Sequence, residues 1–565
     1  MKIQNIQNLV LGRKIKFTPR INNFYHTKPL NNDVLEISFK NKNKVTKPLN
    51  IGYDSASKIV SNLATATSGH RASWGSETFD KDAVKLIALG VAEYAKENSL
   101  INGKPAVIIG GDTRVATRES LPEIKDTLLK QGVDVIYIKD PIPTPLLALT
   151  AKTFDLGISI LMTASHNPWQ DGGFNFITSE GAVAPTSVTG SIAKHIDNIA
   201  KRGSYTEDIV PTGVEYKYDP YNLYLNELDS LGLIDFEKIK NSGIKVYYDG
   251  LQGTGKYVVP RMLDDFNINY KQVNSKGQTG PNPTEANLKE LSKQVKNSDS
   301  ELKIGLANDG DADRFGIIDE NGNFIDPNDV LLLVAHHLIN NKNLSGDIVR
   351  SQATSQLLEK IGQKYGLKTH ETPIGFKYLA SDIMNARKEG RDIIVAGEES
   401  GGLTTYGYIP EKDGILADFL ILDLVAAENK PISEILENVK KDLGYVTYVD
   451  NYSKRLKDEE TKQYVMNKAK KRLEDAFNGD VDFGYKHKVD IIKTLKTKDN
   501  IESYRPEGDG YKFVMTDGST VLIRKSGTEP LTRFYIEATG SNSTEAKENA
   551  LYLKEYVEEE LSEKK

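Results

Sequence analysis

The segment from Asp80 to Asp112 holds two patterns, "DKDAVKLIALGVAEYAKEN" (80–98) and "AVIIGGD" (106–112), that together decide the fold class. In the first pattern the apolar residues recur at helical spacing on one stripe, which predicts an amphipathic helix. They are Val84, Ile87, Ala88, Val91, Tyr94 and Ala95. The second pattern is a short continuous apolar run, typical of a strand buried in a parallel sheet. A helix followed by a buried strand is half of a βαβ unit, so we expect an α/β fold.

The same alternation starts again twice further along the chain. It restarts at "GIKVYYDG" (243–250) and at "SGDIVRSQ" (345–352), and it changes character after about Tyr445. These restarts predict boundaries near residues 217, 326 and 445. The expected segments are an extension at 1–65, α/β domains at 66–217, 218–326 and 327–445, and a C-terminal domain at 446–565.

Composition limits the classes of function. A chain of 565 residues and 62.7 kDa is too long for one hydrophobic core, so several domains are expected. The net charge of −6 argues against a nucleic-acid partner and leaves local basic pockets as sites for small anions. The chain has no cysteine, which excludes disulfides, thiol catalysis and zinc–thiolate sites.

Membrane insertion and targeting are also limited by the sequence. The most apolar runs, such as "ADFLILDLVAA" (417–427), are short and contain Asp, so we expect a soluble protein with no membrane partner. The first fifty residues hold ten Lys/Arg against two Asp/Glu, which is compatible with a transit peptide or with an added arm. Because Ser38 is the only serine there, the arm is favoured and a cytoplasmic location is expected.

A first candidate site is the loop "TASHNPWQDGG" (163–173). The run before it reads as a strand, and Pro168 suits the first position of a following helix, so Ser165 would lie where strand becomes helix. A serine in that position is usually a helix cap. A nucleophilic serine needs a base, a metal or a charged adduct, and only His166 is near in sequence.

A second candidate is "LANDGDADRFGIID" (306–319), where Asp309, Asp311 and Asp313 alternate with small residues. Carboxylates this close repel one another, and a hard divalent cation removes the repulsion by taking oxygen ligands. The loop therefore predicts Mg²⁺ or Mn²⁺. A calcium EF-hand would place Glu320 at position twelve, but Arg314 stands where that motif requires glycine, and apolar strands flank the loop. A metal-free turn is the remaining alternative.

Two more loops carry polar groups suited to a sugar phosphate. "AGEESGG" (396–402) sets two carboxylates and a serine among glycines, which suits hydrogen bonds to sugar hydroxyls at close backbone approach. "IRKSGTEPLTRFYIE" (523–537) combines guanidinium, hydroxyl and glycine N–H groups, the mixture that binds a phosphate dianion. A charged surface hairpin is the alternative for the second loop.

Taken together, the loops resemble the α-D-phosphohexomutase family. The matching pieces occur in order over about residues 65–540: "TSGHR", "GGDTR", "IPTP", "TASHNP", "DGDADR", "PIGFK", "GEESGG", "KDG" and "RKSGTEP". The resemblance implies three α/β domains with mixed sheets around a central cleft, plus a smaller α+β C-terminal domain. It also implies an intramolecular phosphotransferase of the isomerase class, acting on small-molecule hexose phosphates.

The resemblance further implies roles for single residues. Ser165 would be stored as phosphoserine and would share the Mg²⁺ shell with Asp309, Asp311 and Asp313, with glucose 1,6-bisphosphate as activator and intermediate. The implied catalytic residues are Ser165, Arg71, Lys377 and His166. The implied substrate-binding residues are Arg314, Gly397, Glu398, Ser400, Lys412, Arg524, Ser526, Gly527, Thr528 and Arg533. Glu399, the second Glu of its loop, favours glucose, so the expected activity is that of a phosphoglucomutase.

One departure from the family pattern keeps other functions open. The family commonly has lysine ten residues after the phosphoserine, whereas this chain has Asn175, whose amide cannot act as a general base. Arg71 and Lys377 match the family's acid–base neighbourhood and are the alternative proton carriers. The other readings are a phosphomannomutase, a mutase for N-acetylglucosamine phosphates, or a phosphosugar-binding homologue with weak catalysis.

Overall fold

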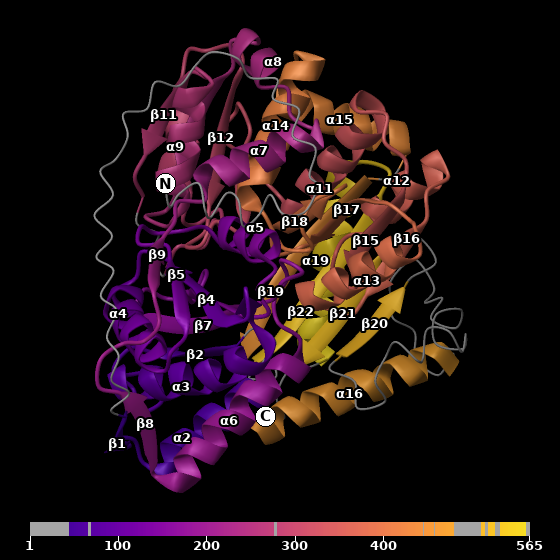
Figure 1. Cartoon of the computed structure of the whole chain (residues 1–565). Helices are drawn as coiled ribbons and strands as arrows, with labels where there is room; N and C mark the ends of the chain where they lie inside the picture. Colours follow the sequence, from indigo (N-terminus) through magenta and orange to yellow (C-terminus); the bar gives the residue numbers. More distant parts are fainter. Residues whose placement is uncertain are drawn as a thin grey trace. The chain divides into compact units, whose positions relative to one another are not determined.

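The computed structural model describes residues 44–65, 69–275, 280–444, 446–456, 458–478, 510–514, 518–525 and 531–560 (Figure 1). The chain divides into two compact units. Of the described residues, the first comprises those up to 142, 146–164 and 170–220, and the second comprises 143–145, 165–169 and those from 221 onward. Two short segments, 143–145 and 165–169, therefore belong to the second unit although the chain on both sides of them belongs to the first.

The first unit is built on a mixed seven-stranded sheet. Its strands run in the order β2-β7-β6-β4-β5-β9, and β3 pairs with β4. Strand β4 is parallel to β5 and β6, whereas β7 is antiparallel to both β6 and β2. The elements are β1 (Lys44–Pro48), α2 (Tyr53–Thr65), β2 (His70–Ser73), α3 (Lys81–Asn98), β3 (Leu100–Ile101), β4 (Lys104–Gly111), α4 (Val115–Lys130), β5 (Asp134–Tyr137), α5 (Thr144–Phe154), β6 (Ser159–Met162), β7 (Asp171–Ile177), α6 (Thr186–Arg202), β8 (Ser204–Asp208) and β9 (Glu215–Lys217).

The two patterns at 80–98 and 106–112 form α3 and β4. Asp80 caps α3, because its Oδ1 accepts a hydrogen bond of 2.8 Å from the Ala83 N–H. Val84, Ile87 and Val91 of the predicted stripe are fully buried in the core of this unit. Strand β4 follows as the buried strand between β5 and β6, so the predicted helix–strand pair is confirmed.

The expected helix after Ser165 is absent, and this prediction was wrong. Residues 163–170 form turns, and the chain then enters strand β7, which pairs antiparallel with β6. The reason lies in "DGGFNFI", where Phe174 and Phe176 alternate with smaller residues and both rings are buried. This period of two specifies a strand, and it outweighs the helix signal of Pro168.

The second unit contains three sheets. The five-stranded sheet has the order β11-β10-β12-β13-β14, one four-stranded sheet has the order β16-β15-β17-β18, and the other, β19-β22-β21-β20, is fully antiparallel. The strands are β10 (Lys245–Asp249), β11 (Tyr270–Val273), β12 (Lys303–Asn308), β13 (Phe315–Ile318), β14 (Phe324–Ile325), β15 (Asp347–Ser351), β16 (Thr369–Thr372), β17 (Ile393–Glu398), β18 (Gly402–Thr405), β19 (Val446–Arg455), β20 (Gly510–Val514), β21 (Thr520–Lys525) and β22 (Leu531–Gly540).

Helices cover these sheets. They are α7 (Tyr221–Leu231), α8 (Phe236–Asn241), α9 (Gly255–Asp265), α10 (Lys289–Lys296), α11 (Pro327–His336), the π-helical turn η1 (His337–Asn341), α12 (Leu357–Tyr365), α13 (Phe376–Lys388), α14 (Gly414–Glu428), α15 (Ile432–Leu443), α16 (Glu459–Asn478) and α19 (Ser543–Glu560). With the first unit, they complete three α/β domains and a C-terminal domain, so the predicted fold class is confirmed.

The apolar run "ADFLILDLVAA" lies in α14, which is buried on all sides from Gly414 to Ala426. Its inward Asp423 is neutralised, because it accepts hydrogen bonds from His337 Nε2 at 2.8 Å and pairs with Lys342 Nζ at 2.5 Å. A helix that is apolar all round belongs in a core. Among the described helices, none has the length and apolarity that crossing a membrane requires.

The C-terminal sheet is joined to the β15–β18 domain by polar contacts, of which the one at Ser355 is buried. Ser355 Oγ donates a 2.6 Å hydrogen bond to Glu537 of β22, and the Gln356 N–H donates to the same carboxylate at 3.0 Å. Lys512 of β20 donates to Glu371 at 3.0 Å. Glu537 is 5% exposed, and this burial raises the pKa of its carboxyl above the ordinary value.

Candidate active site

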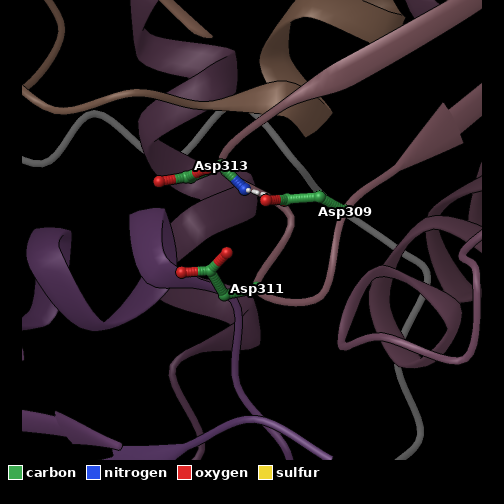
Figure 2. Close-up of side chains that lie close together, drawn as sticks. All are labelled: Asp309, Asp311 and Asp313. Carbon is green, nitrogen blue, oxygen red and sulfur yellow. Dashed lines mark hydrogen bonds between the residues drawn. The ribbon is translucent and has the colours of Figure 1, made fainter. Parts of the chain in front are cut away.

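The three aspartates lie on one loop between two antiparallel strands. Strand β12 ends at Asn308 and β13 begins at Phe315, directly opposite it in the ladder. The loop is shaped by Asp309, whose Oδ1 accepts hydrogen bonds from the N–H groups of Asp313 at 3.1 Å and Arg314 at 3.2 Å. Figure 2 shows the Asp313 N–H directed at the Asp309 carboxylate. The sequence predicted this loop and both flanking strands.

The three carboxylates form a buried cluster of oxygen atoms. One carboxylate oxygen from each of Asp309, Asp311 and Asp313 lies within 4.8 Å of the others, and all three residues are at most 4% exposed. Burial, followed by repulsion from the other two carboxylates, raises the pKa of Asp309 well above its ordinary value. A set of hard oxygen donors in this arrangement fits Mg²⁺.

The calcium alternative places Glu320 among the ligands, and the structure does not support it. Glu320 follows β13, and its carboxylate accepts a hydrogen bond from the Ser433 hydroxyl at the start of α15. The acidic loop is bracketed by strands, whereas an EF-hand loop is bracketed by helices.

Ser165 lies directly against this cluster. Its Oγ donates a 2.9 Å hydrogen bond to Asp309 Oδ2, and His166 Nδ1 lies 3.4 Å from the same Oγ. Ser165 is 3% exposed and has a φ of +51°, a left-handed conformation that a non-glycine residue seldom adopts. A Cβ on Gly310 would lie 2.6 Å from the Ser165 carbonyl oxygen, so the two loops meet at a distance that requires glycine.

Thr144 is a site residue that the analysis of the sequence missed. Its Oγ1 donates a 2.7 Å hydrogen bond to Asp311 Oδ2, and its N–H donates to the Asp311 carbonyl at 2.9 Å. Thr144 therefore orients one of the three carboxylates. The signal was present, because Thr144 is the third residue of the "IPTP" motif, but the motif alone did not indicate which group the hydroxyl holds.

Asp313 lies between two cations. Lys412 Nζ forms an ion pair with Asp313 Oδ2, and Arg314 Nε lies 3.8 Å from Asp313 Oδ1. Burial lowers the pKa of Lys412, but the carboxylates of Asp313 and Glu411 more than compensate and hold it above its ordinary value. Lys412 therefore places a positive charge beside the acidic cluster.

The carboxylates of Glu398 and Glu399 lie at the end of β17. Glu398 accepts a 2.9 Å hydrogen bond from the N–H of Gly375, and burial together with Glu399 raises its pKa to about 7. Glu399 accepts a 3.0 Å hydrogen bond from Ser351 Oγ, and burial raises its pKa also. The Gly375 contact brings the "PIGFK" and "GEESGG" motifs together, although they are 23 residues apart.

Other predicted residues near these carboxylates differ in exposure. Ser400 is exposed at the turn after Glu398, whereas Gly397 is buried in β17, where a Cβ would lie 2.2 Å from Leu331 of α11. Lys377 is the second residue of α13, and its Nζ lies 5.0 Å from the centre of the Tyr378 ring.

Arg524 and Arg533 face each other across two strands. They are direct partners in the antiparallel β21–β22 pair. Like charges directly opposite destabilise a strand pair unless an anion lies between them, so this pair is suited to bind one. Ser526, Gly527 and Thr528, predicted to complete the phosphate site, lie outside the described residues.

In the first unit, Arg71 lies on β2 opposite Gly173 of β7. Next to it, His70 Nε2 contacts the Thr78 carbonyl oxygen at 2.8 Å, and burial lowers the pKa of this imidazole. Asn175, where the family commonly has lysine, is buried in β7 opposite Leu161.

A buried carboxylate fixes the chain on the approach to Ser165. Asp112 accepts hydrogen bonds from Arg114 N at 3.0 Å, Arg114 Nε at 2.9 Å, Thr117 Oγ1 at 2.6 Å and Thr163 Oγ1 at 2.8 Å. The side chains of Asp112 and Arg114 are at most 1% exposed. Thr163 stands two residues before Ser165, so this network holds the end of the strand that leads to the candidate nucleophile.

A buried serine hydroxyl that donates a hydrogen bond to one of three clustered carboxylates is suited to a metal-dependent group-transfer enzyme, here on an α/β scaffold. Comparison with known families gives the particular family. Four models match: Phosphoglucomutase/phosphomannomutase alpha/beta/alpha domain I at 62–203, domain II at 222–322, domain III at 326–442 and the C-terminal domain at 460–551. The chain belongs to the α-D-phosphohexomutase family. It is an isomerase-class phosphotransferase of carbohydrate metabolism, and the family is Mg²⁺-dependent.

Similar proteins carry several substrate names. A phosphoglucomutase/phosphomannomutase of Thermococcus kodakarensis is 27% identical over 445 residues, which is 77% of this chain and 86% of the relative. A phosphoglucosamine mutase of Staphylococcus epidermidis is 25% identical, over 81% of this chain and 90% of the relative, and a phosphoglucomutase of Staphylococcus haemolyticus is 25% identical, over 85% and 91%. The open form of Paramecium parafusin has the same fold, with a TM-score of 0.74 and 22% identity over 92% of this chain and 96% of that one.

Proposed function

We propose that this phosphohexomutase is a phosphoglucomutase that interconverts glucose 1-phosphate and glucose 6-phosphate through a phosphoserine at Ser165. The observation that carries the proposal is the 2.9 Å contact between Ser165 Oγ and Asp309 Oδ2, within a cluster that fits Mg²⁺. Ser165 does not act as a helix cap, because no helix follows it.

The reaction moves one phosphoryl group out and another back. The bond between phosphorus and Ser165 Oγ breaks as a bond forms to the 6-oxygen of glucose 1-phosphate, and the proton of that hydroxyl passes by way of a base to Ser165 Oγ. The product, glucose 1,6-bisphosphate, turns around in the site. Its 1-phosphoryl group then returns to Ser165 Oγ, whose proton passes to the 1-oxygen of the sugar, which leaves glucose 6-phosphate. Mg²⁺ held by the aspartates supplies charge compensation for the phosphoryl group in transit.

Three side chains are candidates to carry the proton between the sugar hydroxyl and Ser165 Oγ. His166 Nδ1 lies 3.4 Å from Ser165 Oγ and is close enough to exchange a proton with it. Arg71 and Lys377 match the family's acid–base positions, as expected from the sequence. Since Asn175 cannot carry a proton, turnover depends on these three side chains.

Both orientations of the sugar must be held by the same groups. Glu398, whose pKa of about 7 lets it accept or donate a hydrogen bond, and Ser400 are proposed to bind the 3- and 4-hydroxyls. Arg524 and Arg533, with the predicted Ser526 and Thr528, are proposed to bind the phosphate that is not being transferred. The facing arginines support this, because a dianion relieves their repulsion.

The sugar preference rests on Glu399. In the family, two successive glutamates at this loop accompany glucose phosphates, and the Ser351 hydroxyl holds Glu399 in place at 3.0 Å. Because similar proteins are named for different sugar phosphates, turnover of a panel of substrates is the decisive test.

The test is turnover of purified protein with Mg²⁺ and a trace of glucose 1,6-bisphosphate. Glucose 1-phosphate, mannose 1-phosphate, glucosamine 1-phosphate and N-acetylglucosamine 1-phosphate are compared, with a Ser165→Ala variant as the control. We expect the highest kcat/KM for glucose 1-phosphate. No product above the control with any sugar would refute mutase activity, and a higher kcat/KM for another sugar would refute only the glucose assignment.

The presence of Asn175 supports a second candidate, a phosphosugar-binding protein with weak catalysis. General acid–base catalysis is worth about 10²- to 10⁴-fold, so its partial loss lowers the rate without removing the binding site. Binding of glucose 1-phosphate without turnover, unchanged in an Asn175→Lys variant, would favour this candidate.

A further inference from the structure

Lys412 is placed where it can act on the metal site as well as on the substrate. Its ammonium pairs with Asp313 Oδ2, and the two side chains are only 15% and 5% exposed. The contact joins residues 99 positions apart in the chain, from the loop after β12 and the turn before α14. Ion pairs shielded from water to this degree are stronger than surface pairs.

The backbone beneath this ion pair is fixed. The Gly414 N–H donates a 3.1 Å hydrogen bond to the Ala312 carbonyl, and the Phe315 N–H donates to Gly401 at 3.0 Å. A Cβ on Gly414 would lie 2.4 Å from the Arg314 carbonyl oxygen, so the backbone segments are in direct contact. Backbone hydrogen bonds and close packing therefore hold these segments together independently of the lysine side chain.

The alkyl chain of Lys412 packs against Gly402, in the loop that carries Glu398 and Glu399. A Cβ on Gly402 would lie 2.4 Å from Lys412 Cδ, so glycine makes room for the stem. Nζ lies 5.8 Å from the centre of the Phe376 ring, and the ammonium lowers the pKa of Glu398, although burial and Glu399 raise it more. The ammonium thus lies between the metal-binding carboxylates and the groups proposed to hold the sugar.

An ammonium and a dication cannot use the same carboxylate oxygen equally well. Lys412 takes Asp313 Oδ2 as its hydrogen-bond acceptor, and an ammonium and a divalent cation at the same carboxylate repel each other. We propose that Lys412 competes with the divalent cation for Asp313, so that the cation binds more tightly once an anionic sugar phosphate draws the ammonium away. This inference rests on the proposed function, since it takes the cation and the sugar phosphate from there.

The consequence is coupling between the two ligands. If the sugar phosphate relieves the competition, it raises the affinity for Mg²⁺, and by thermodynamic reciprocity Mg²⁺ raises the affinity for the sugar phosphate by the same factor. Lys412 is then a positioning residue for the metal site. It favours the complex that holds both Mg²⁺ and the sugar phosphate over the complexes that hold only one of them.

The first experiment measures Mg²⁺ binding by calorimetry to metal-stripped, substrate-free, full-length protein. We expect Lys412→Met to bind Mg²⁺ about tenfold more tightly than the wild type, because a competing cation is gone, and Lys412→Arg to stay within about twofold. Damage to the fold would weaken binding, so a gain in affinity separates competition from a structural role. Wild-type or weaker affinity in Lys412→Met would overturn the inference.

The matched control is Lys440→Met. Lys440 forms a similar half-buried pair with Asp329, at 2.7 Å and with side chains 20% and 17% exposed, between α15 and α11. Its removal takes away one positive charge without touching the acidic loop, so Mg²⁺ affinity is expected to be unchanged. Thermal unfolding verifies that each variant is folded, and Lys412→Gln replaces Lys412→Met if the latter does not fold.

The second experiment measures the coupling in a Ser165→Ala background, which prevents turnover. Saturating glucose 1-phosphate is expected to tighten Mg²⁺ binding severalfold more when Lys412 is present than in Lys412→Met, and equal gains would overturn the inference. An Asp311→Asn variant separates the two proposals. If Asp311→Asn binds Mg²⁺ as the wild type does, the proposed metal site is wrong. If Asp311→Asn loses Mg²⁺ binding, the metal site stands, and the Lys412 variants then test only the competition.

Discussion

Removal of the Asp112 carboxylate tests how the strand that leads to Ser165 is held. The carboxylate accepts four hydrogen bonds from Arg114, Thr117 and Thr163. Breaking a buried ion pair by deleting one partner leaves the other charge uncompensated and costs about 3–5 kcal/mol. We therefore expect Asp112→Ala to lower the unfolding midpoint of the first unit by roughly 6–20 °C, taking 2–4 °C per kcal/mol for a domain of this size.

The chain offers a specific reporter for this unit. It has two tryptophans, of which Trp74 belongs to the first unit and Trp169 to the second. In a Trp169→Phe background, thermal unfolding followed by fluorescence reports on Trp74, whose ring contacts Phe79 edge-on at 6.1 Å. The measurement therefore follows the unit that contains Asp112.

The matched control is Asp197→Ala, which breaks the exposed ion pair with Lys201 on α6. Exposed pairs contribute little to stability, so no measurable shift is expected. If Asp112→Ala shifts the Trp74 transition no more than this control does, the network around Asp112 does not hold the strand, and the reasoning is refuted.

Three further predictions concern the candidate site. Thr144→Val should weaken Mg²⁺ binding about tenfold, because the hydroxyl orients Asp311; calorimetry that finds equal affinity would contradict this. Glu398→Gln should stabilise the protein at pH 8 but little at pH 4. The pKa of the Glu398 carboxyl is about 7 in the folded protein and lower in the unfolded chain, so the wild type loses stability as the pH rises from about 4.5 through 7. Glutamine carries no charge and avoids this loss. Urea unfolding at both pH values measures the difference, and an equal gain at pH 4 and pH 8 would count against it. Arg524→Ala should raise the KM for glucose 1-phosphate about 10- to 100-fold, and Arg533→Ala should do the same, because each removes charge-assisted hydrogen bonds to phosphate; unchanged KM values in steady-state kinetics would exclude both from the phosphate site.

Local patterns in the sequence were enough to predict the elements that form from neighbouring residues. The stripe in α3, the buried strand β4 and the acidic loop between two strands all depend on side chains within about twenty positions. The prediction of a helix after Ser165 was wrong because Pro168 is a weaker signal than the alternating phenylalanines of β7, which pack in the core.

Contacts between distant residues could not be predicted in this way. Asp311 is 167 positions from Thr144, and Asp313 is 99 positions from Lys412, so no periodicity or spacing connects them. The family resemblance indicated only that Lys412 binds substrate. The structure shows that its ammonium also pairs with Asp313, a carboxylate of the acidic loop. The predicted domain boundaries and the roles of the individual site residues stay predictions.

Arg524 and Arg533 place two like charges directly opposite each other on β21 and β22. If the phosphate binds at these arginines as proposed, its oxygens bridge the two strands, and bound substrate stabilises the strand pair. Loss of the phosphate would then restore the repulsion between the two arginines and favour release of the product.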